Sequence, residues 1–221
     1  MQYSIDKKRT DQIISFLQSL NIQSERLYEL IKKKDQLTIQ TFNEALTHSS
    51  ENKIINYEKL EFFGDAVLRL AASNFIENKY NNMSVGERSE LRSIIVSDDW
   101  LNQLGKKIKV EKIILKGSKA LGDENSRDTI IAEVTEALIG ALYKCFNSVE
   151  EVNLWLDNFW EKDAEIFLNA PYKYNAKTKL QEWCQSKGYE LPRYKISEVS
   201  KIHGDPKRFF CEIFVNGSKE A

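Results

Sequence analysis

Residues 57–68 read YEKLEFFGDAVL, and the order of their side chains predicts an amphipathic helix with an acidic face. Three acids, Glu58, Glu61 and Asp65, stand at positions i, i+3 and i+7. At about 100° of rotation per residue they fall within about 60° of arc, so they share one side of the helix. Apolar side chains recur at helical spacing through this segment and just beyond it, at Leu60, Phe63, Val67, Leu70 and Ala71.

A second acidic pair lies in residues 130–142, which read IIAEVTEALIGAL. Glu133 and Glu136 stand at i and i+3, so they also share one face of a helix. Both sets of acids interrupt apolar segments, and we expect Gly64 and Gly140 to let the two helices approach closely. The prediction is one carboxylate cluster built from two helices.

The predicted cluster has few cationic neighbours in the sequence. No Lys or Arg stands three or four residues after Glu61, Glu133 or Glu136. Asp65 differs, because Arg69 stands four residues after it. Like charges repel, and a desolvated carboxylate without a partner is costly. A divalent cation resolves this conflict, and hard oxygen ligands favour Mg²⁺ or Mn²⁺.

Two other interpretations of the acids compete with a metal site. In the first, they lie on ordinary solvated helix faces. The second, a di-iron carboxylate bundle, requires Glu-x-x-His on two helices. The two histidines, His48 and His203, do not follow a glutamate by three residues, which excludes the di-iron site. We expect His48 to be a buried hydrogen-bonding residue, since a metal mechanism needs no histidine base.

The first 170 residues predict an almost wholly helical domain, because proline is absent before Pro171 and the apolar residues recur at helical spacing. Helix starts are predicted at Thr41, Ser84, Ser97 and Ser148. A polar stretch at 169–175 predicts a linker. After it, the sequence predicts a helix at 176–187 ended by Gly188, and two strands at 193–200 and 208–215.

Charge is unevenly distributed along the chain, whose formal net charge is −1. Residues 171–221 carry a net charge of +4 and residues 1–170 a net charge of −5. The C-terminal segment is therefore mildly basic and the rest of the chain acidic. No segment approaches the roughly 18 apolar residues of a membrane span, and the N-terminus does not resemble a signal peptide. The three cysteines lack metal-ligand spacing, so we expect reduced thiols in a cytoplasmic protein without a membrane partner.

Residues 57–68 resemble the signature segment of the ribonuclease III family. The resemblance continues in the family's order at 45–49 (ALTHS), 86–92 (GERSELR) and 135–140 (TEALIG). Residues 177–182 (KTKLQE) resemble the opening helix of a double-stranded-RNA-binding domain. The resemblance implies an all-α endonuclease domain with the ribonuclease III-like helical fold at 1–168, a linker at 169–175, and a small, truncated α+β double-stranded-RNA-binding domain at 176–221.

The implied function is an endoribonuclease that cleaves double-stranded RNA by metal-dependent phosphodiester hydrolysis. The resemblance implies 5′-phosphate and 3′-hydroxyl ends, a role in rRNA and mRNA processing, and a homodimer with Mg²⁺ or Mn²⁺ and no small-molecule cofactor. By position, it assigns the metal site to Glu61, Asp65, Glu133 and Glu136, with Asp65 and Glu136 as the catalytic pair. Glu58 would support the signature helix near the dimer interface.

For the second domain, the resemblance implies minor-groove contacts with duplex RNA. The candidate residues are Thr178, Lys179, Gln181, Glu182, His203 and Lys207. A third strand, and the second helix with the family's main phosphate-binding lysines, are expected to be missing.

The sequence departs from the family at Glu133, where the family usually has Asp, and this moves the carboxylate one methylene further out. It also lacks the acids that the family often has at Val85 and Lys119. The alternative function is therefore a non-cleaving double-stranded-RNA-binding protein on the same fold.

Overall fold

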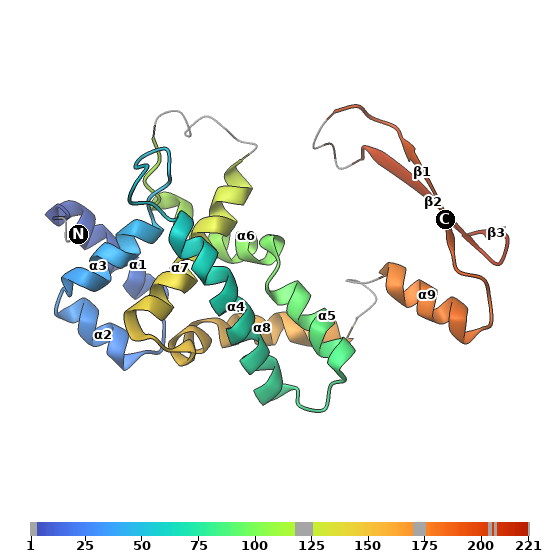
Figure 1. Ribbon diagram of the computed structural model, residues 1–221, viewed down its shortest axis with the longest axis horizontal. Coiled ribbons are helices and arrows are strands. Elements are labelled where there is room, and N and C mark those ends of the chain that lie inside the picture. Colours follow the sequence, from blue (N-terminus) through green and yellow to red (C-terminus); the bar gives the residue numbers. More distant parts are fainter. Residues whose placement is uncertain (1–3, 118–125, 170–175, 203–204, 206, 221) are drawn as a thin grey trace. The chain divides into compact units, whose positions relative to one another are not determined.

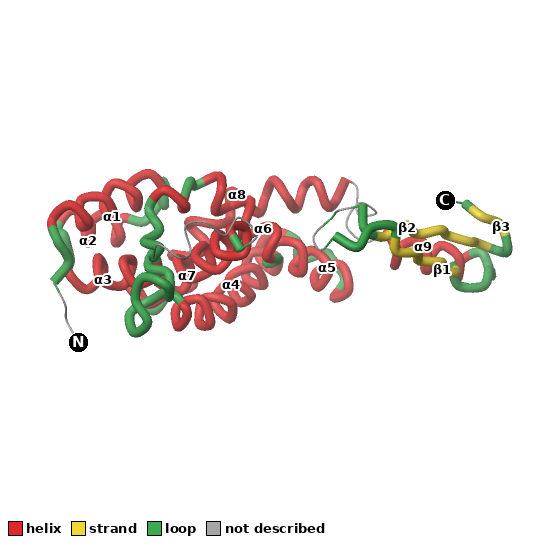
Figure 2. The backbone as a smooth tube through the Cα atoms, turned by 90° about the horizontal axis from the view of Figure 1, so that it is seen from above, coloured by secondary structure: helices red, strands yellow, loops and turns green. Residues whose placement is uncertain are grey.

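The computed structural model describes residues 4–117, 126–169, 176–202, 205 and 207–220, and the chain divides into two compact units, Met1–Glu165 and Ile166–Ala221. In the described ranges, every strand lies in the second unit (Figures 1 and 2). The first unit holds α1 (Lys7–Ser19), α2 (Glu25–Lys32), α3 (Gln36–Ala45), α4 (Glu58–Lys79), α5 (Val85–Ile95), α6 (Asp98–Lys107), the short 3-10 helix η1 (Val110–Lys112), α7 (Arg127–Phe146) and most of α8 (Val149–Asn169).

α7 is the central helix of the first unit and packs against α3, α4 and α6 (Figure 1). It is buried on nearly every side because its sequence is apolar almost all round. The buried side chains of its middle turns include Ile131, Val134, Leu138 and Leu142. The predicted helix at 130–142 is confirmed, and it forms the core against which the acidic helix α4 packs.

Side-chain caps confirm three of the four predicted helix starts. Ser84 begins α5 with a capping box in which its hydroxyl and the Glu87 carboxylate bond each other's backbone N–H groups. Ser97 caps α6, and Ser148 accepts a hydrogen bond from the N–H of Glu150 in the first turn of α8 at 3.2 Å. These bonds satisfy N–H groups that the first turn of a helix leaves without partners.

The predicted helix start at Thr41 is wrong. Thr41 lies inside α3, where its hydroxyl donates to the Leu37 carbonyl one turn earlier at 2.8 Å. The helix begins instead after Asp35, whose carboxylate accepts the N–H of Thr38 at 2.8 Å. A threonine next to polar residues resembles a cap in sequence, but the aspartate upstream already serves that role.

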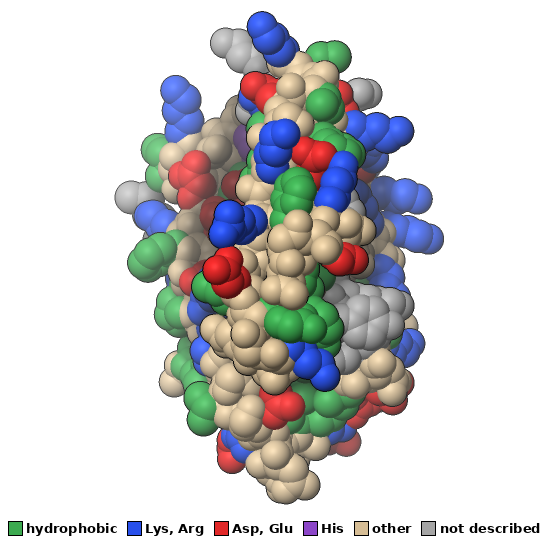
Figure 3. Space-filling model, turned by 90° about the vertical axis from the view of Figure 1, so that its right-hand side faces the viewer, with side chains coloured by type: hydrophobic (Ala, Val, Ile, Leu, Met, Phe, Trp, Pro, Cys, Tyr) green, Lys and Arg blue, Asp and Glu red, His purple; other side chains and the backbone are tan. Residues whose placement is uncertain are grey.

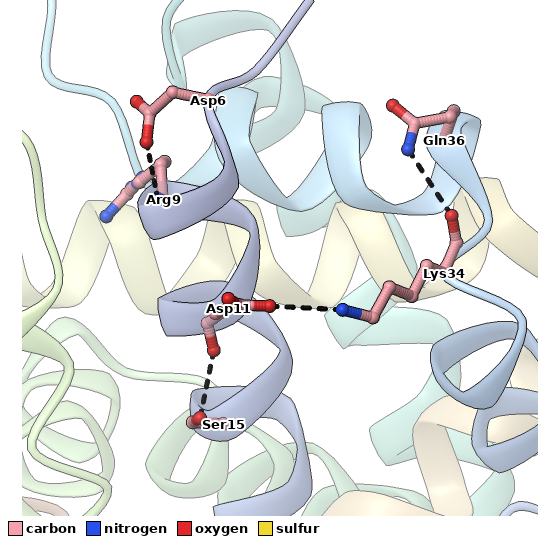
Figure 4. A network of polar contacts seen from close by, with 6 residues as sticks. All are labelled: Asp6, Arg9, Asp11, Ser15, Lys34 and Gln36. Carbon is pink, nitrogen blue, oxygen red and sulfur yellow. Dashed lines mark hydrogen bonds and ion pairs between the residues drawn. The ribbon is translucent and has the colours of Figure 1, made fainter.

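Polar contacts tie α1 to the turn before α3 (Figure 4). The Asp6 carboxylate caps α1 by accepting the N–H of Arg9 at 2.9 Å. One turn further, Lys34 forms an ion pair with Asp11, with the Lys34 Nζ 3.2 Å from the Asp11 Oδ1 (Figure 4). The buried Arg9 side chain also donates to Asn43 Oδ1 at 2.8 Å, so α1 is fixed against α3.

The second unit holds α9 (Ala176–Ser186) and an antiparallel sheet. Its three strands are β1 (Arg193–Glu198), β2 (Phe209–Val215) and β3 (Ser218–Lys219), in the order β1–β2–β3. β1 pairs with β2, and Arg193 stands opposite Phe214. These elements confirm the predicted helix and both predicted strands. The helix ends at Ser186, and the predicted stop signal, Gly188, follows two residues later with a left-handed φ of 70° that favours glycine.

The expectation of only two strands is wrong, because β3 (Ser218–Lys219) pairs with β2. Asn216 and Gly217 form the two-residue connection, with φ angles of 48° and 82°. An Asn-Gly pair readily adopts two consecutive positive φ angles, which two-residue hairpins require. The Asn-Gly pair is therefore the sequence signal for this third strand.

α8 ends at Asn169, the first residue of the predicted linker, and residues 170–175 lie outside the described residues. His203, a predicted RNA contact, lies outside them as well. None of the helices in the described ranges is long and apolar enough to span a membrane.

Candidate active site

α4 and α7 cross in direct backbone contact. A Cβ atom placed on Gly64 would lie 2.1 Å from the backbone oxygen of Glu136, and one on Gly140 would lie 2.3 Å from the backbone oxygen of Leu60. Distances this short leave no room for any side chain at either glycine. The predicted close approach at Gly64 and Gly140 is confirmed, and it brings the acids of both helices to one place.

A cavity of about 310 Å³ lies beside this crossing. Three of the predicted site acids line it: Glu61 from α4, and Glu133 and Glu136 from α7. Asp65 is not among the lining residues, although its charge acts on Glu136. Glu58 is exposed in the first turn of α4, and its charge acts on Glu61.

The cavity is electrostatically unfavourable for additional negative charge. Burial raises the pKa of Glu136 to about 7, and the nearby Asp65 and Glu61 charges add to the shift. Burial also raises the pKa of Glu61, with further contributions from Glu133 and Glu58. A bound cation would relieve this repulsion, because it favours the charged form of every carboxylate around it.

Two of the predicted metal acids have protein partners. Arg69 forms an ion pair with Asp65 at 2.8 Å, as their spacing along α4 allows. The Tyr57 hydroxyl donates to Glu133 Oε2 at 2.5 Å. His48, near Tyr57 with ring centroids 5.5 Å apart, is only half-buried, and its Nδ1 lies 2.7 Å from the Ser50 hydroxyl. It is hydrogen-bonded as predicted but less buried than predicted.

Five further polar residues, which the sequence did not predict for the site, line the cavity: Asp98, Asp99, Asn102, Asp128 and Thr129. The two aspartates of α6 follow its cap Ser97, where acids are common at any helix start, so their sequence signal was not specific. Asp128 forms an ion pair with Lys106 at 2.8 Å. Only the packing of α6 against α7 shows that these residues face the same cavity.

The donor chemistry of the cavity fits a hard divalent cation. Its predicted acids supply oxygen ligands only, which suit Mg²⁺ or Mn²⁺. In the described part of the chain, no group of three or more His, Cys, Asp or Glu side chains stands in a ready-made metal-binding arrangement. Asp65 is paired with Arg69, and Glu133 with Tyr57. A bound cation would therefore either replace these partners or share the two carboxylates with them.

A larger groove, of about 900 Å³, lies elsewhere, between α1 and the segment after α6. It is lined by several lysines and by none of the predicted site acids. Although this groove is larger, its lining residues do not form a set of groups that could hydrolyse a phosphodiester. We therefore place the candidate active site in the smaller acidic cavity.

The predicted RNA contacts of α9 lie at or near its surface. Thr178 and Glu182 are exposed, and Lys179 and Gln181 are half-buried, with Lys179 Nζ 3.1 Å from Glu182. Lys207 is exposed in the connection between β1 and β2. In the face of the molecule that Figure 3 shows, basic side chains alternate with acidic and apolar ones, so no single-signed patch covers it.

Comparison with known proteins identifies the family of both units. Residues 39–153 match the family described as Ribonuclease-III-like, and residues 176–220 match the double-stranded RNA binding motif. Ribonuclease 3 of Prochlorococcus marinus is 47% identical over 211 residues, which cover 96% of this chain and 84% of that protein. The chain belongs to the ribonuclease III family. As a ribonuclease III, it is a double-stranded-RNA-specific endoribonuclease, and the alternative of a non-cleaving binder is not favoured.

Other relatives of this ribonuclease III support the same assignment. A Nostoc protein named Ribonuclease 3 2 is 38% identical over 176 residues, which cover 79% of this chain and 72% of that protein. The nuclease domain of ribonuclease III from Campylobacter jejuni matches with a TM-score of 0.50 at 23% identity, over 73% of this chain and 96% of that one. Dicer from Pichia stipitis matches with the same TM-score and identity, over 81% and 82%. These two structures show a shared fold.

Proposed function

We propose that Glu61, Asp65, Glu133 and Glu136 hold a divalent cation, Mg²⁺ or Mn²⁺, at which this ribonuclease III hydrolyses double-stranded RNA. The observation that carries the proposal is the state of Glu136, whose pKa rises to about 7 in a cavity lined by further carboxylates. Such crowding of acids is unfavourable unless a cation joins them.

The side chains have distinct roles in this proposal. Bound there, the cation would lower the pKa of a water molecule and offset the charge that develops on the phosphate. Glu136 and Asp65 would act as the catalytic pair that orients the water and the scissile phosphate. Glu61 and Glu133 complete the oxygen donors, and Glu58 supports α4 from its first turn. The expected products carry 5′-phosphate and 3′-hydroxyl ends.

The exposed face of α4 supports a homodimer. Phe62 is 84% exposed and Leu70 is 51% exposed, and Ala66 between them is also exposed. The spacing of four residues puts all three on one face, opposite the side that packs on α7. A large exposed aromatic is costly, and an identical copy would cover it through a two-fold axis. The Campylobacter jejuni nuclease domain likewise has a region involved in dimer formation.

The second unit would hold the duplex. Its match to the double-stranded RNA binding motif supports contacts across the minor groove by Thr178, Lys179, Gln181, Glu182 and, from the strand connection, Lys207. The proposed domains keep the predicted bounds of 1–168 and 176–221. Roles in rRNA and mRNA processing, and a place in the cytoplasm, stay predictions from the resemblance.

A labelled RNA duplex incubated with Mg²⁺, and in parallel with EDTA, tests the proposed function. We expect 5′-phosphorylated fragments with Mg²⁺, and binding without cleavage in EDTA. The same RNA in single-stranded form is the control and should stay intact. Binding without cleavage under both conditions would contradict the proposal and support the non-cleaving alternative.

A further inference from the structure

Tyr57 is a buried residue that contacts Glu133, one of the acids lining the cavity. Its side chain is only 4% exposed, and its hydroxyl donates to Oε2 of Glu133 at 2.5 Å. The two residues lie 76 positions apart, so the contact exists only because α4 and α7 cross. A hydrogen bond to a charged acceptor is stronger than one between neutral groups. This contact therefore constrains where the Glu133 carboxylate lies.

The backbone around Tyr57 holds the donor in place. Its N–H donates to the Thr47 carbonyl at 3.0 Å, and its own carbonyl accepts from Glu61 N at 2.9 Å in the first turn of α4. Its ring lies beside that of His48, with centroids 5.5 Å apart. The phenol is thus fixed by the start of the helix that carries Glu61 and Asp65. Because the Tyr57 hydroxyl is already fixed, little further conformational entropy is lost when it orients the Glu133 carboxylate.

Glu133 needs such a partner more than a shorter acid would. A glutamate has one more rotatable bond than an aspartate, and that freedom must be lost before the carboxylate can occupy one position. The negative charge of Glu61 repels the Glu133 carboxylate inside the cavity that both residues line. Tyr57 binds one carboxylate oxygen and leaves the other available, and as a neutral donor it does not replace a cation.

We infer that Tyr57 is a positioning residue that orients the Glu133 carboxylate for the divalent cation. This inference rests on the proposed metal role of Glu133. Orienting partners of metal ligands typically account for about 10- to 100-fold in metal affinity. Tyr57 touches neither RNA nor the reacting atoms in this account, so its effect should pass entirely through Glu133.

The test uses Tyr57→Phe in the full chain, which keeps the buried ring and removes only the hydroxyl. Direct titration with Mn²⁺, followed by the electron paramagnetic resonance of the free ion, should show binding about tenfold weaker than in the unaltered protein. The Mg²⁺ concentration for half-maximal cleavage should rise by a similar factor, with duplex binding in EDTA unchanged. Tyr80→Phe, at the far end of α4, is the matched control and should leave Mn²⁺ affinity unchanged.

Glu133→Gln, alone and combined with Tyr57→Phe, separates this inference from the proposed function. If Tyr57 acts through Glu133, its removal should weaken Mn²⁺ binding in the unaltered protein and have no further effect beside Glu133→Gln. Any loss of folding stability caused by Tyr57→Phe occurs both in the unaltered protein and beside Glu133→Gln, so it cancels when the two are compared. Thermal unfolding of each variant checks that the losses are equal.

Each other outcome overturns a specific statement. If Glu133→Gln weakens Mn²⁺ binding but Tyr57→Phe does not, the positioning role is wrong and the proposed metal site stands. An equal loss from Tyr57→Phe in both backgrounds would show that Tyr57 does not act through Glu133, which also overturns the inference. Unchanged binding in Glu133→Gln would remove Glu133 from the proposed metal site, and the role of Tyr57 with it.

Discussion

Gly64 of α4 lies against the backbone of Glu136 in α7, and a Cβ atom there would stand 2.1 Å from the Glu136 carbonyl oxygen. Glu136 thus belongs both to the packing of α7 against α4 and to the lining of the acidic cavity. Because the carbonyl is part of a rigid helix, it cannot move aside as the end of a flexible side chain would. The position of the Glu136 carboxylate depends on this contact.

Gly64→Ala should lower the free energy of unfolding by about 3 kcal/mol and also reduce cleavage, since overpacking would push α4 away from α7. Gly86→Ala is the matched control, because a Cβ at Gly86 in α5 would be 4.0 Å from its nearest neighbour, the Ser84 hydroxyl. Alanine there should be neutral or slightly stabilising. Urea unfolding of the unaltered protein, Gly64→Ala and Gly86→Ala measures the difference in the free energy of unfolding. Equal midpoints for the two variants would contradict the packing account.

The raised pKa of Glu136 predicts a pH dependence of stability in the metal-free protein. The pKa is 4.5 in the unfolded reference and about 7 in the folded chain, so the folded state holds the proton more tightly. Its contribution is therefore fully present below pH 4.5 and is lost as the pH rises through 7. Glu136→Gln keeps a neutral side chain at every pH and should escape this loss.

At pH 8 in EDTA, we expect Glu136→Gln to be more stable than the unaltered protein by about 1 kcal/mol, a modest value because the side chain is partly exposed. At pH 4 the difference should vanish. Thermal unfolding across this range measures it, and a stability difference independent of pH would contradict the assigned pKa.

Sequence reasoning predicted the helices and the acids but not their complete surroundings. The apolar spacing of α7 and the glycines at 64 and 140 are enough to predict that two acidic helices pack together. Asp98 and Asp128 reach the cavity through the packing of α6 on α7, which local periodicity does not encode. The contact of Tyr57 with Glu133 is equally invisible to spacing, because it spans 76 residues.

Phe62→Asp should dissociate the proposed homodimer. Phe62 is 84% exposed, and burying such a ring in an interface stabilises it by about 1.5–3 kcal/mol in each copy. Losing both rings and adding two charges should raise the dimer dissociation constant at least about a hundredfold. Sedimentation equilibrium measures this, with Leu37→Asp in α3 as a control that also replaces an exposed apolar side chain. Unchanged dimerisation by Phe62→Asp would exclude this face of α4.

Lys179 and Lys207 should contribute to RNA affinity through phosphate contacts. Replacing both by Gln should weaken duplex binding uniformly across sequences and lower the slope of log K against log salt by about 1 for each lysine. A salt series of binding in EDTA measures the slope. Lys32→Gln in α2 of the first unit is the control, and a double variant with a slope equal to that control would remove both lysines from the interface.

Turnover of a labelled RNA duplex by Glu136→Gln at saturating Mg²⁺ tests the central claim most directly, with binding of the same duplex measured in parallel. The amide keeps the shape of the side chain but removes one negative oxygen donor from the cavity. We predict that cleavage falls by at least about a hundredfold while the duplex stays bound with unchanged affinity. Cleavage at the rate of the unaltered protein would show that the α4–α7 carboxylates do not form the active site.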